Sequence, residues 1–416
     1  MRFLIKTLGC KVNAYESAVV SEILKKSDWE EVKENADVCI INTCTVTNTA
    51  DLKSLKIIRQ LSRMNRDAVT VVMGCYSQAN IEVLKNMDEV DIIIGTNTKS
   101  KILEYIELFL NTNTKIIDVL DPDKFEFDDM VLTSFPHKRA FVKIEDGCDN
   151  YCSYCIIPYV RGHVRSKEKE LVISEIKDLV CNGFEEIVLT GIHTGHYGSD
   201  LENYSFADLL SDILKIKDLK YIRISSIEIT ELNDNFLKIL KSNKVIVDHL
   251  HIPLQSGSDT ILKLMNRKYD KEYFSNKIDS IRKIRPDISI TTDVIVGFPS
   301  ETDELFDETI ETIKKISFSK IHVFPFSSRN GTPASNMDNQ VSESIKKKRV
   351  IELIELSKEL EIKYMEKFVG KPVNFIVEVI RDGYAYGHTG NYLNIKSINT
   401  NGYTVIKKIE YPYCID

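Results

Sequence analysis

Three closely spaced cysteines, Cys148, Cys152 and Cys155, form a C-x3-C-x2-C pattern directly after a strand-like run at residues 140–145. This spacing brings three thiolates onto one small loop, where they can bind three irons of a 4Fe-4S cluster and leave the fourth iron without a protein ligand. Such an open iron can bind a small molecule. One alternative is a structural zinc site with His163 as fourth ligand, because closed zinc sites have four nitrogen or sulfur ligands. Plain electron transfer by a cluster is another.

The cysteine pattern, with the aromatic Tyr154 directly before its last cysteine, resembles the signature of radical S-adenosylmethionine enzymes. In that superfamily the open iron binds the amino and carboxylate groups of S-adenosylmethionine, and the aromatic residue lies near the adenine. The resemblance implies S-adenosylmethionine as cofactor and its one-electron cleavage to a 5′-deoxyadenosyl radical as reaction type. The cofactors carry this chemistry, while the protein positions them.

Three further cysteines occupy equivalent positions near the start of the chain. Cys10, Cys44 and Cys75 each follow the end of an apolar, strand-like run. Because the carboxyl ends of parallel strands share one edge of a sheet, we expect the three thiols to converge there despite their separation in sequence. Convergence predicts a second cluster with three cysteine ligands. The alternative is that they are small buried apolar residues.

The nine cysteines of the chain are an odd number, which argues against a disulfide framework and favours reduced thiols. Reduced, clustered thiols are most often metal ligands. Cys39 lies within a strand-like run and is expected to be a small core residue. Cys181 and Cys414 have no expected role.

Length and composition indicate an ordinary soluble chain of several domains. The 416 residues exceed what one hydrophobic core normally organises, so two or three domains are expected. No apolar stretch approaches the roughly 20 residues needed to cross a bilayer, and the first residues read as a strand rather than a signal peptide. We therefore expect a cytoplasmic protein without membrane contacts. The net charge of −7 gives no support for a polyanionic partner, although a local basic patch can still bind nucleic acid.

Residues 1–118 alternate strand-like and helix-like runs, which predicts a small α/β domain with a parallel sheet. The acidic stretch at residues 118–133 lacks periodicity and contains Pro122, so we expect a linker there. The predicted strands are residues 3–6, 38–42, 69–73 and 91–94.

The alternation restarts on a larger scale in residues 134–366, where six strand-like runs are separated by helical segments. Six consecutive βα units predict a partial (βα)6 barrel of the TIM type, with active-site groups at the carboxyl ends of the strands. The predicted strands are residues 140–145, 186–190, 221–226, 247–253, 288–296 and 320–325.

Residues 367–416 alternate apolar and polar residues at 373–379, 392–397 and 403–408, between glycine-containing turn signals. This pattern predicts a small antiparallel β-barrel. The segment resembles the TRAM domain, an RNA-binding barrel; the alternative is that it only caps the central domain.

Motifs along essentially the whole chain resemble the methylthiotransferase family. The matching runs are residues 8–13, 42–47, 147–159, 250–258 and 292–302. The resemblance implies that a cluster on Cys10, Cys44 and Cys75 supplies or carries sulfur, while the cluster on the C-x3-C-x2-C loop generates the radical. It further implies two molecules of S-adenosylmethionine, one as methyl donor and one as radical source. An electron donor and a sulfur source are implied as partners.

The Lys11-Val12-Asn13 variant, together with residues 156–166 and 323–327, resembles the subgroup that acts on N6-threonylcarbamoyladenosine. That subgroup adds a methylthio group to C2 of the adenine beside the tRNA anticodon, which makes the anticodon stem-loop the implied partner. Two alternatives keep the chemistry and change the substrate to isopentenyladenosine in tRNA or to an aspartate of a ribosomal protein. An alternative from another class is a noncatalytic iron-sulfur RNA-binding protein, which predicts clusters without turnover.

Several polar residues are candidates for binding the cofactor or the substrate. Arg161 and Arg165 could contact the carboxylate or phosphates of the substrate, because arginine suits planar anions; the alternative is solvated surface arginines. The basic run at residues 346–349 is expected on a solvated or RNA-facing helix face. Residues at predicted strand ends that could bind the cofactor are Gly191, Ser226, Gln255 and Asp293.

Overall fold

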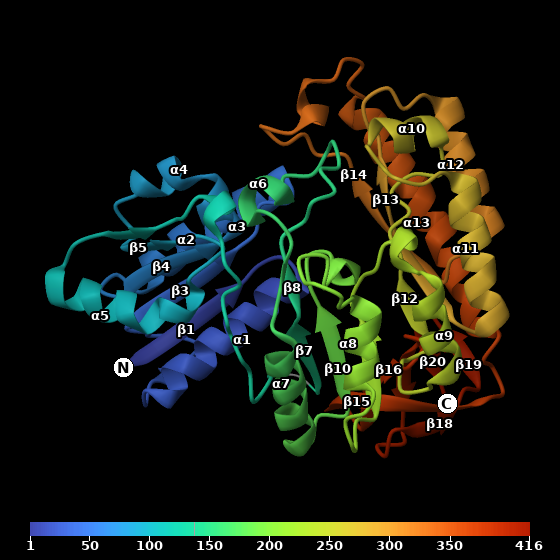
Figure 1. Cartoon of the computed structure of the whole chain (residues 1–416), viewed down its shortest axis with the longest axis horizontal. Helices are drawn as coiled ribbons and strands as arrows, with labels where there is room; N and C mark the ends of the chain where they lie inside the picture. The colour runs from blue at the N-terminus through green and yellow to red at the C-terminus, as the bar shows by residue number, and fades with distance from the viewer. Residues whose placement is uncertain (137) are drawn as a thin grey trace.

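The computed structural model describes residues 1–136 and 138–416. Three groups of strands follow one another along the chain (Figure 1). A parallel sheet flanked by helices, in blue, lies on the left; central strands wrapped by helices run from green to orange; and red strands lie below the central ones. The expected α/β class with a β-rich C-terminal piece is confirmed.

The N-terminal sheet has six parallel strands in the order β2-β1-β3-β4-β5-β6. The four expected strands are present, and two short edge strands, β2 (Glu30–Glu31) and β6 (Ile116–Asp118), were missed because so few residues show no periodicity. β3 and β4 are buried throughout, as expected for parallel strands covered on both faces. The other strand bounds are β1 Arg2–Thr7, β3 Val38–Thr43, β4 Val69–Gly74 and β5 Ile92–Ile94.

The strand order of this sheet reverses between β1 and β3, and such a switch point opens a crevice at the carboxyl ends of the strands. Cys10 lies directly before α1, and Cys44 directly follows β3, so these cysteines flank the crevice. The helices of this part are α1 Lys11–Lys26, α2 Asn48–Met64, α3 Cys75–Ala79, α4 Ile81–Lys85 and α5 Ile102–Thr112.

The central part contains the six expected parallel strands as two three-stranded sheets, β11-β10-β7 and β12-β13-β14. A parallel bridge between Ile222 and Ile246 joins the sheets. The strands are β7 Arg139–Lys143, β10 Glu186–Thr190, β11 Tyr221–Ile224, β12 His249–His251, β13 Ser289–Val296 and β14 Lys320–Pro325. The helices are α7 Lys169–Cys181, α8 Phe206–Ile213, α9 Asp234–Ser242, α10 Asp259–Leu264, α11 Lys271–Ile284, α12 Asp303–Ile316 and α13 Glu343–Glu366.

Side chains alternate between the two faces of each barrel strand, and the alternation separates apolar from polar groups. On β7, Ala140 and Val142 are fully buried in the same apolar core as Val172 and Ile176 of α7. Lys143, on the other face of the strand, pairs with Glu16 and Asp146, and its ammonium lies 5.3 Å from the centroid of the Phe127 ring.

The loop that carries Cys148, Cys152 and Cys155 is closed at its base by a short antiparallel pair, β8 (Glu145–Asp146) and β9 (Arg165–Ser166). The Cys148 backbone N–H also donates to the carbonyl of Gly162, 3.0 Å away. A short helix, α6 (Ile157–Arg161), follows the last cysteine. Backbone hydrogen bonds therefore hold the two ends of the loop together.

The C-terminal sheet has the order β18-β15-β16-β17-β20-β19, with antiparallel pairing except for β17 and β20, which pair in parallel. Three of its six strands, β16, β19 and β20, were not expected from the sequence. β19 and β20 have only three residues each, and β16 follows β15 after a tight turn. The strands are β15 Pro372–Arg381, β16 Tyr384–Thr389, β17 Asn394–Ser397, β18 Tyr403–Val405, β19 Lys408–Glu410 and β20 Tyr413–Ile415.

This sheet docks against the amino ends of the barrel strands, as Figure 1 shows below β7 and β10. Arg139, the first residue of β7, pairs with Glu378 at 2.7 Å. The ring of Tyr392 stacks on His249 of β12, with ring centroids 4.9 Å apart. The C-terminal sheet thus caps the central domain, which was one of the two roles considered for it.

The basic run on α13 corrects an expectation. A solvated or RNA-facing face was expected for the whole run; Lys347 and Lys348 are exposed, but Lys346 and Arg349 are buried. Arg349 Nη1 lies 2.7 Å from Glu301 Oε2, and a Cβ on Gly297 would lie only 2.3 Å from the aliphatic chain of Lys346. Neither α13 nor any other helix in the described ranges is long and apolar enough to cross a membrane.

Candidate active site

Of the three cysteines of the loop, Cys152 is buried and Cys148 and Cys155 are half-buried. The Cys155 backbone N–H donates to the carbonyl of Cys152, 3.0 Å away. Burial raises the pKa of the Cys155 thiol to about 12, and the neighbouring Cys152 thiol contributes to the rise. Burial likewise raises the pKa of Cys148 well above its usual value. A bound cation would reverse this effect, because metal coordination deprotonates thiols.

Two residues that the sequence did not reveal contact these cysteines. Arg267 Nη1 donates to Cys152 Sγ at 3.2 Å, and its guanidinium pairs with Glu228. Nδ1 of His193 lies 3.7 Å from Cys148 Sγ. His193 and Glu228 follow the ends of barrel strands, and this position could have marked them as site residues from the sequence. Arg267 lies in a loop after α10, where no sequence pattern marks it.

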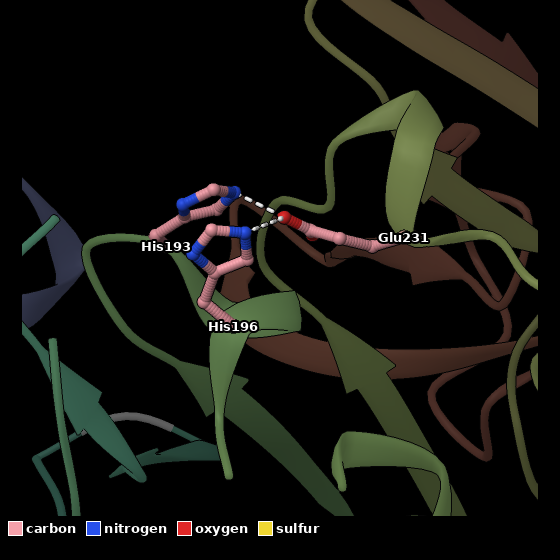
Figure 2. A group of neighbouring side chains, drawn as sticks. All are labelled: His193, His196 and Glu231. Carbon is pink, nitrogen blue, oxygen red and sulfur yellow. Dashed lines mark ion pairs between the residues drawn. The ribbon is translucent and has the colours of Figure 1, made fainter. Parts of the chain in front are cut away.

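His193, His196 and Glu231 form a compact polar group beside Cys148 (Figure 2). The two imidazole rings stack with centroids 3.7 Å apart, and both Nε2 atoms face Oε1 of Glu231. His196 Nε2 lies 3.4 Å from Glu231 Oε1. The ligand atoms of the three residues lie within 4.8 Å of one another. A carboxylate between two imidazoles can take up a cationic group of a bound ligand.

The geometry of His163 does not support the zinc alternative. Its Nδ1 lies 2.5 Å from Asp149 Oδ1 and its Nε2 lies 3.8 Å from Asp123 Oδ1, so carboxylates face both ring nitrogens. The side chain is 59% exposed. His163 is therefore engaged outside the cysteine group.

The second set of cysteines meets at the crevice of the N-terminal sheet. Gly9 has a φ of +98°, and a Cβ there would lie 3.0 Å from Cys44 Sγ, so the backbone before Cys10 passes against Cys44. Burial raises the pKa of Cys44 to about 11, and the thiols of Cys75 and Cys10 contribute to the rise. Each of the three thiols thus lies within electrostatic reach of the others.

Arg161 joins the two cysteine sets. It is the last residue of α6, directly after the first cysteine loop, and it is fully buried. Its Nε donates to Cys75 Sγ at 3.3 Å and its Nη2 to Asn13 Oδ1 at 3.0 Å. Its Nη1 lies 2.9 Å from Asp146 Oδ1 and 3.1 Å from Glu16 Oε1. The expected substrate contact of Arg161 is corrected accordingly, because all three nitrogens are engaged by protein groups away from solvent.

A buried charge network surrounds Arg161. Lys99 Nζ lies 2.7 Å from Glu16 Oε2, and Lys143 Nζ lies 2.6 Å from Asp146 Oδ2. Burial alone would raise the pKa of Glu16, but Arg161, Lys99 and Lys143 hold it well below its usual range. Three buried cations thus face two carboxylates. Negative charge on the neighbouring thiolates would offset the excess, so this site fits a thiolate-ligated metal group.

Arg165 also differs from expectation. Its Nη1 donates to the backbone carbonyls of Arg161 and His163, at 2.8 and 2.6 Å. Its guanidinium lies over the ring of Phe125, 5.3 Å from the centroid. Arg165 therefore stabilises the loop to which it belongs, and this geometry does not support a contact with the substrate.

A cavity of about 190 Å³ lies between the central barrel and the N-terminal part. Tyr154, Gln255 and Asp293 line it on the barrel side, and Val46 and Thr47 line it on the other. The structure thus brings three of the five expected cofactor-binding residues to one cavity.

The other two candidates lie outside the lining of this cavity. Gly191 is packed against Glu145, because a Cβ there would lie 2.6 Å from Glu145 Oε2. That same oxygen accepts a hydrogen bond from the backbone N–H of His193 at 2.7 Å. Ser226 lies half-buried, two residues beyond β11.

Two family models match the chain. Residues 2–95 match the family described as uncharacterized protein family UPF0004, and residues 142–313 match the radical SAM superfamily. Among solved structures, the methyltransferase TsrM from Kitasatospora setae has a TM-score of 0.59 at 13% identity, over 80% of this chain and 77% of that chain. The radical enzyme OxsB has a TM-score of 0.52 at 12% identity, over 88% and 56% of the chains. Both likenesses concern the fold.

Curated relatives match almost the full length. A threonylcarbamoyladenosine tRNA methylthiotransferase MtaB of Bacillus subtilis is 42% identical over 98% of this chain and 94% of the relative. The protein of the same name in Aquifex aeolicus is 38% identical over 98% and 99%. A tRNA-2-methylthio-N(6)-dimethylallyladenosine synthase of Clostridium botulinum is 36% identical over 90% and 86%. With two cysteine sets joined by Arg161 and relatives of this kind over its whole length, the chain belongs to the methylthiotransferase family of radical S-adenosylmethionine enzymes.

Proposed function

We propose that this enzyme adds a methylthio group to C2 of N6-threonylcarbamoyladenosine beside the tRNA anticodon, with two 4Fe-4S clusters and S-adenosylmethionine. The observation that carries the proposal is the contact between Arg161, which follows the cysteine loop, and Cys75 of the second set, since it supports neighbouring positions for the two sets. If the two cysteine sets are adjacent, one base of the tRNA can lie within reach of both clusters. The relatives named for threonylcarbamoyladenosine support this choice of substrate.

Each cysteine set has a proposed task. Cys148, Cys152 and Cys155 would hold the cluster that leaves one iron open for S-adenosylmethionine, and Arg267 would donate to the Cys152 thiolate. When bound, the cluster and S-adenosylmethionine supply one-electron cleavage and a 5′-deoxyadenosyl radical. Tyr154, together with Gln255 and Asp293 on the same side of the cavity, would orient the adenosine part of that cofactor.

The second set would hold the sulfur-supplying cluster, with Cys10, Cys44 and Cys75 as ligands. The excess positive charge of the buried network would stabilise the thiolates, as oppositely charged neighbours favour the ionised form. Arg161 would add a charge-assisted hydrogen bond to Cys75.

The C-terminal sheet would bind the anticodon stem-loop as a TRAM-like unit. It carries exposed apolar and aromatic side chains, among them Ile380 of β15, Ile398 directly after β17 and Tyr403 of β18. Small β-barrels bind single-stranded RNA by stacking bases on such side chains. An electron donor and a sulfur source complete the proposed set of partners.

Analysis of tRNA nucleosides tests the substrate. In a strain without this gene, mass spectrometry of digested tRNA should show loss of 2-methylthio-N6-threonylcarbamoyladenosine and accumulation of its unmethylthiolated precursor. Reintroducing the gene should restore the product. Loss of the methylthio form of isopentenyladenosine instead would assign the alternative tRNA substrate, and two unchanged nucleosides would remove tRNA from the proposal.

Iron content tests the two-cluster proposal. Anaerobically reconstituted protein should contain about eight irons per chain, and Cys44→Ala should contain about four. We expect Cys44→Ala still to release 5′-deoxyadenosine but to form no methylthio product. Cys39→Ala is the matched control, because Cys39 is buried in β3 away from the crevice and should leave iron content unchanged. Four irons in the unaltered protein would contradict a second cluster.

A further inference from the structure

One cationic group next to Cys10, the ammonium of Lys11, has no anionic partner among the described residues. Lys11, the first residue of α1, is half-buried. Within residues 1–136 and 138–416, its ammonium group makes neither a hydrogen bond nor an ion pair. The charged and titratable groups that act on it most strongly are Tyr392, Arg223, Arg139 and the Cys10 thiol. Lys11 therefore reaches from the crevice of the N-terminal sheet toward the lower barrel interior.

Two further buried donors near Lys11 are unsatisfied. Arg223 is 2% exposed; its Nε and Nη2 bind Glu186 at 2.7 and 3.1 Å, but its Nη1 has no partner within the described part of the chain. His249 is 6% exposed and its Nδ1 is also without a partner there. When His249 Nε2 accepts from the Thr291 hydroxyl, 3.0 Å away, Nδ1 carries the proton and can donate.

Arg223 and His249 both pack against the ring of Tyr392. The Arg223 guanidinium lies 4.8 Å from the Tyr392 centroid, and the His249 ring stacks on Tyr392 at 4.9 Å. Lys11 acts electrostatically on His249 as well as on Tyr392. Buried unsatisfied donors are costly, so Arg223 Nη1 and His249 Nδ1, with the unpaired ammonium of Lys11 within electrostatic reach, indicate a missing acceptor.

The carboxylates nearby are already engaged. Glu186 pairs with Arg223, and Glu378 lies 2.7 Å from Arg139. Asp293 pairs with His251 at 3.2 Å. The surplus of positive charge at Lys11 therefore matches an anion that a ligand brings.

We propose that Lys11, Arg223 Nη1 and His249 Nδ1 form a binding site for the carboxylate on the side chain of the modified base. This inference rests on the proposed function. The threonylcarbamoyl group carries a carboxylate, whereas the dimethylallyl group in the name of the Clostridium botulinum relative is uncharged. Because Lys11 directly follows Cys10, a base held at the second cysteine set can extend its N6 side chain toward these donors.

A matched pair of RNA ligands tests the site through binding. Two anticodon stem-loops of one sequence carry N6-threonylcarbamoyladenosine or its neutral methyl ester, and fluorescence anisotropy gives Kd with the reconstituted enzyme. We expect the acid to bind about 10-fold or more tightly than the ester. Lys11→Met should remove this preference by weakening only the acid. Lys11→Arg should retain it, and so should Lys6→Met, a control at an exposed lysine of β1.

The outcomes separate this inference from the proposed function. If Lys11→Met keeps the unaltered preference for the acid, or the unaltered enzyme has none, the carboxylate site is wrong. If the unaltered enzyme prefers the acid but forms no methylthio product on it, the proposed function fails while the binding site stands. Retained binding of the ester by Lys11→Met shows that the variant is folded.

Discussion

Arg161→Met is expected to lower the free energy of unfolding of the apoprotein by about 3–5 kcal/mol, the usual cost of removing one partner from a buried ion pair. Glu16 and Asp146 would each lose a contact to the guanidinium, at 3.1 and 2.9 Å, in a region without solvent. Cys75 and Asn13 would lose hydrogen bonds as well. Denaturant unfolding of the metal-free chain under anaerobic conditions measures this loss.

The same substitution should weaken the second cluster selectively, because Arg161 touches Cys75 and no cysteine of the loop. After reconstitution, electron paramagnetic resonance should show a changed signal for the second cluster only. Arg63→Met, on the exposed face of α2, is the control and should leave both properties unchanged. Unfolding within about 0.5 kcal/mol of the unaltered chain, the range of ordinary surface substitutions, would contradict the proposed bridging role of Arg161.

Gly147→Ala is expected to open the first cysteine loop and abolish radical formation. Gly147 has a φ of +89°, and an added Cβ would lie 1.9 Å from the carbonyl oxygen of His163. That contact is with backbone, so the base of the loop, where Cys148 N–H donates to Gly162, must separate. We expect a loss of at least about 3 kcal/mol of stability and no 5′-deoxyadenosine. Iron analysis and nucleoside chromatography measure the effects.

Gly183→Ala is the matched control, because it has the energetic cost of alanine at a positive φ without the steric clash of Gly147→Ala. Gly183 has nearly the same φ, +87°, but a Cβ there would meet no atom within 4 Å. It should cost only about 1–2 kcal/mol, the usual penalty for a left-handed alanine, and leave iron content unchanged. Equal losses for both variants would show that the contact with His163 does not matter.

The expectations that failed share a physical cause. Arg161 was expected to contact the substrate, and Lys346 and Arg349 were expected on a solvated or RNA-facing helix face, because arginine and lysine are rarely fully buried without partners. The two arginines have partners far along the chain: Glu16 is 145 residues from Arg161, and Glu301 is 48 residues from Arg349. No local pattern encodes such pairs. The domain boundaries near residues 118, 134 and 367 stay a prediction.

The sequence by itself determined the elements and the ligand chemistry. Period-two and period-3.6 patterns reflect local burial, so β3, β4 and the six barrel strands could be located from the order of apolar and polar residues alone. The position of each cysteine after a strand end likewise followed from local order. Only the tertiary structure decided that Arg161 contacts Cys75 and that Lys11 lies within electrostatic reach of Arg223 and His249. Those meetings depend on how separate sheets pack and on which buried charges can be neutralised, and neither is a property of neighbouring residues.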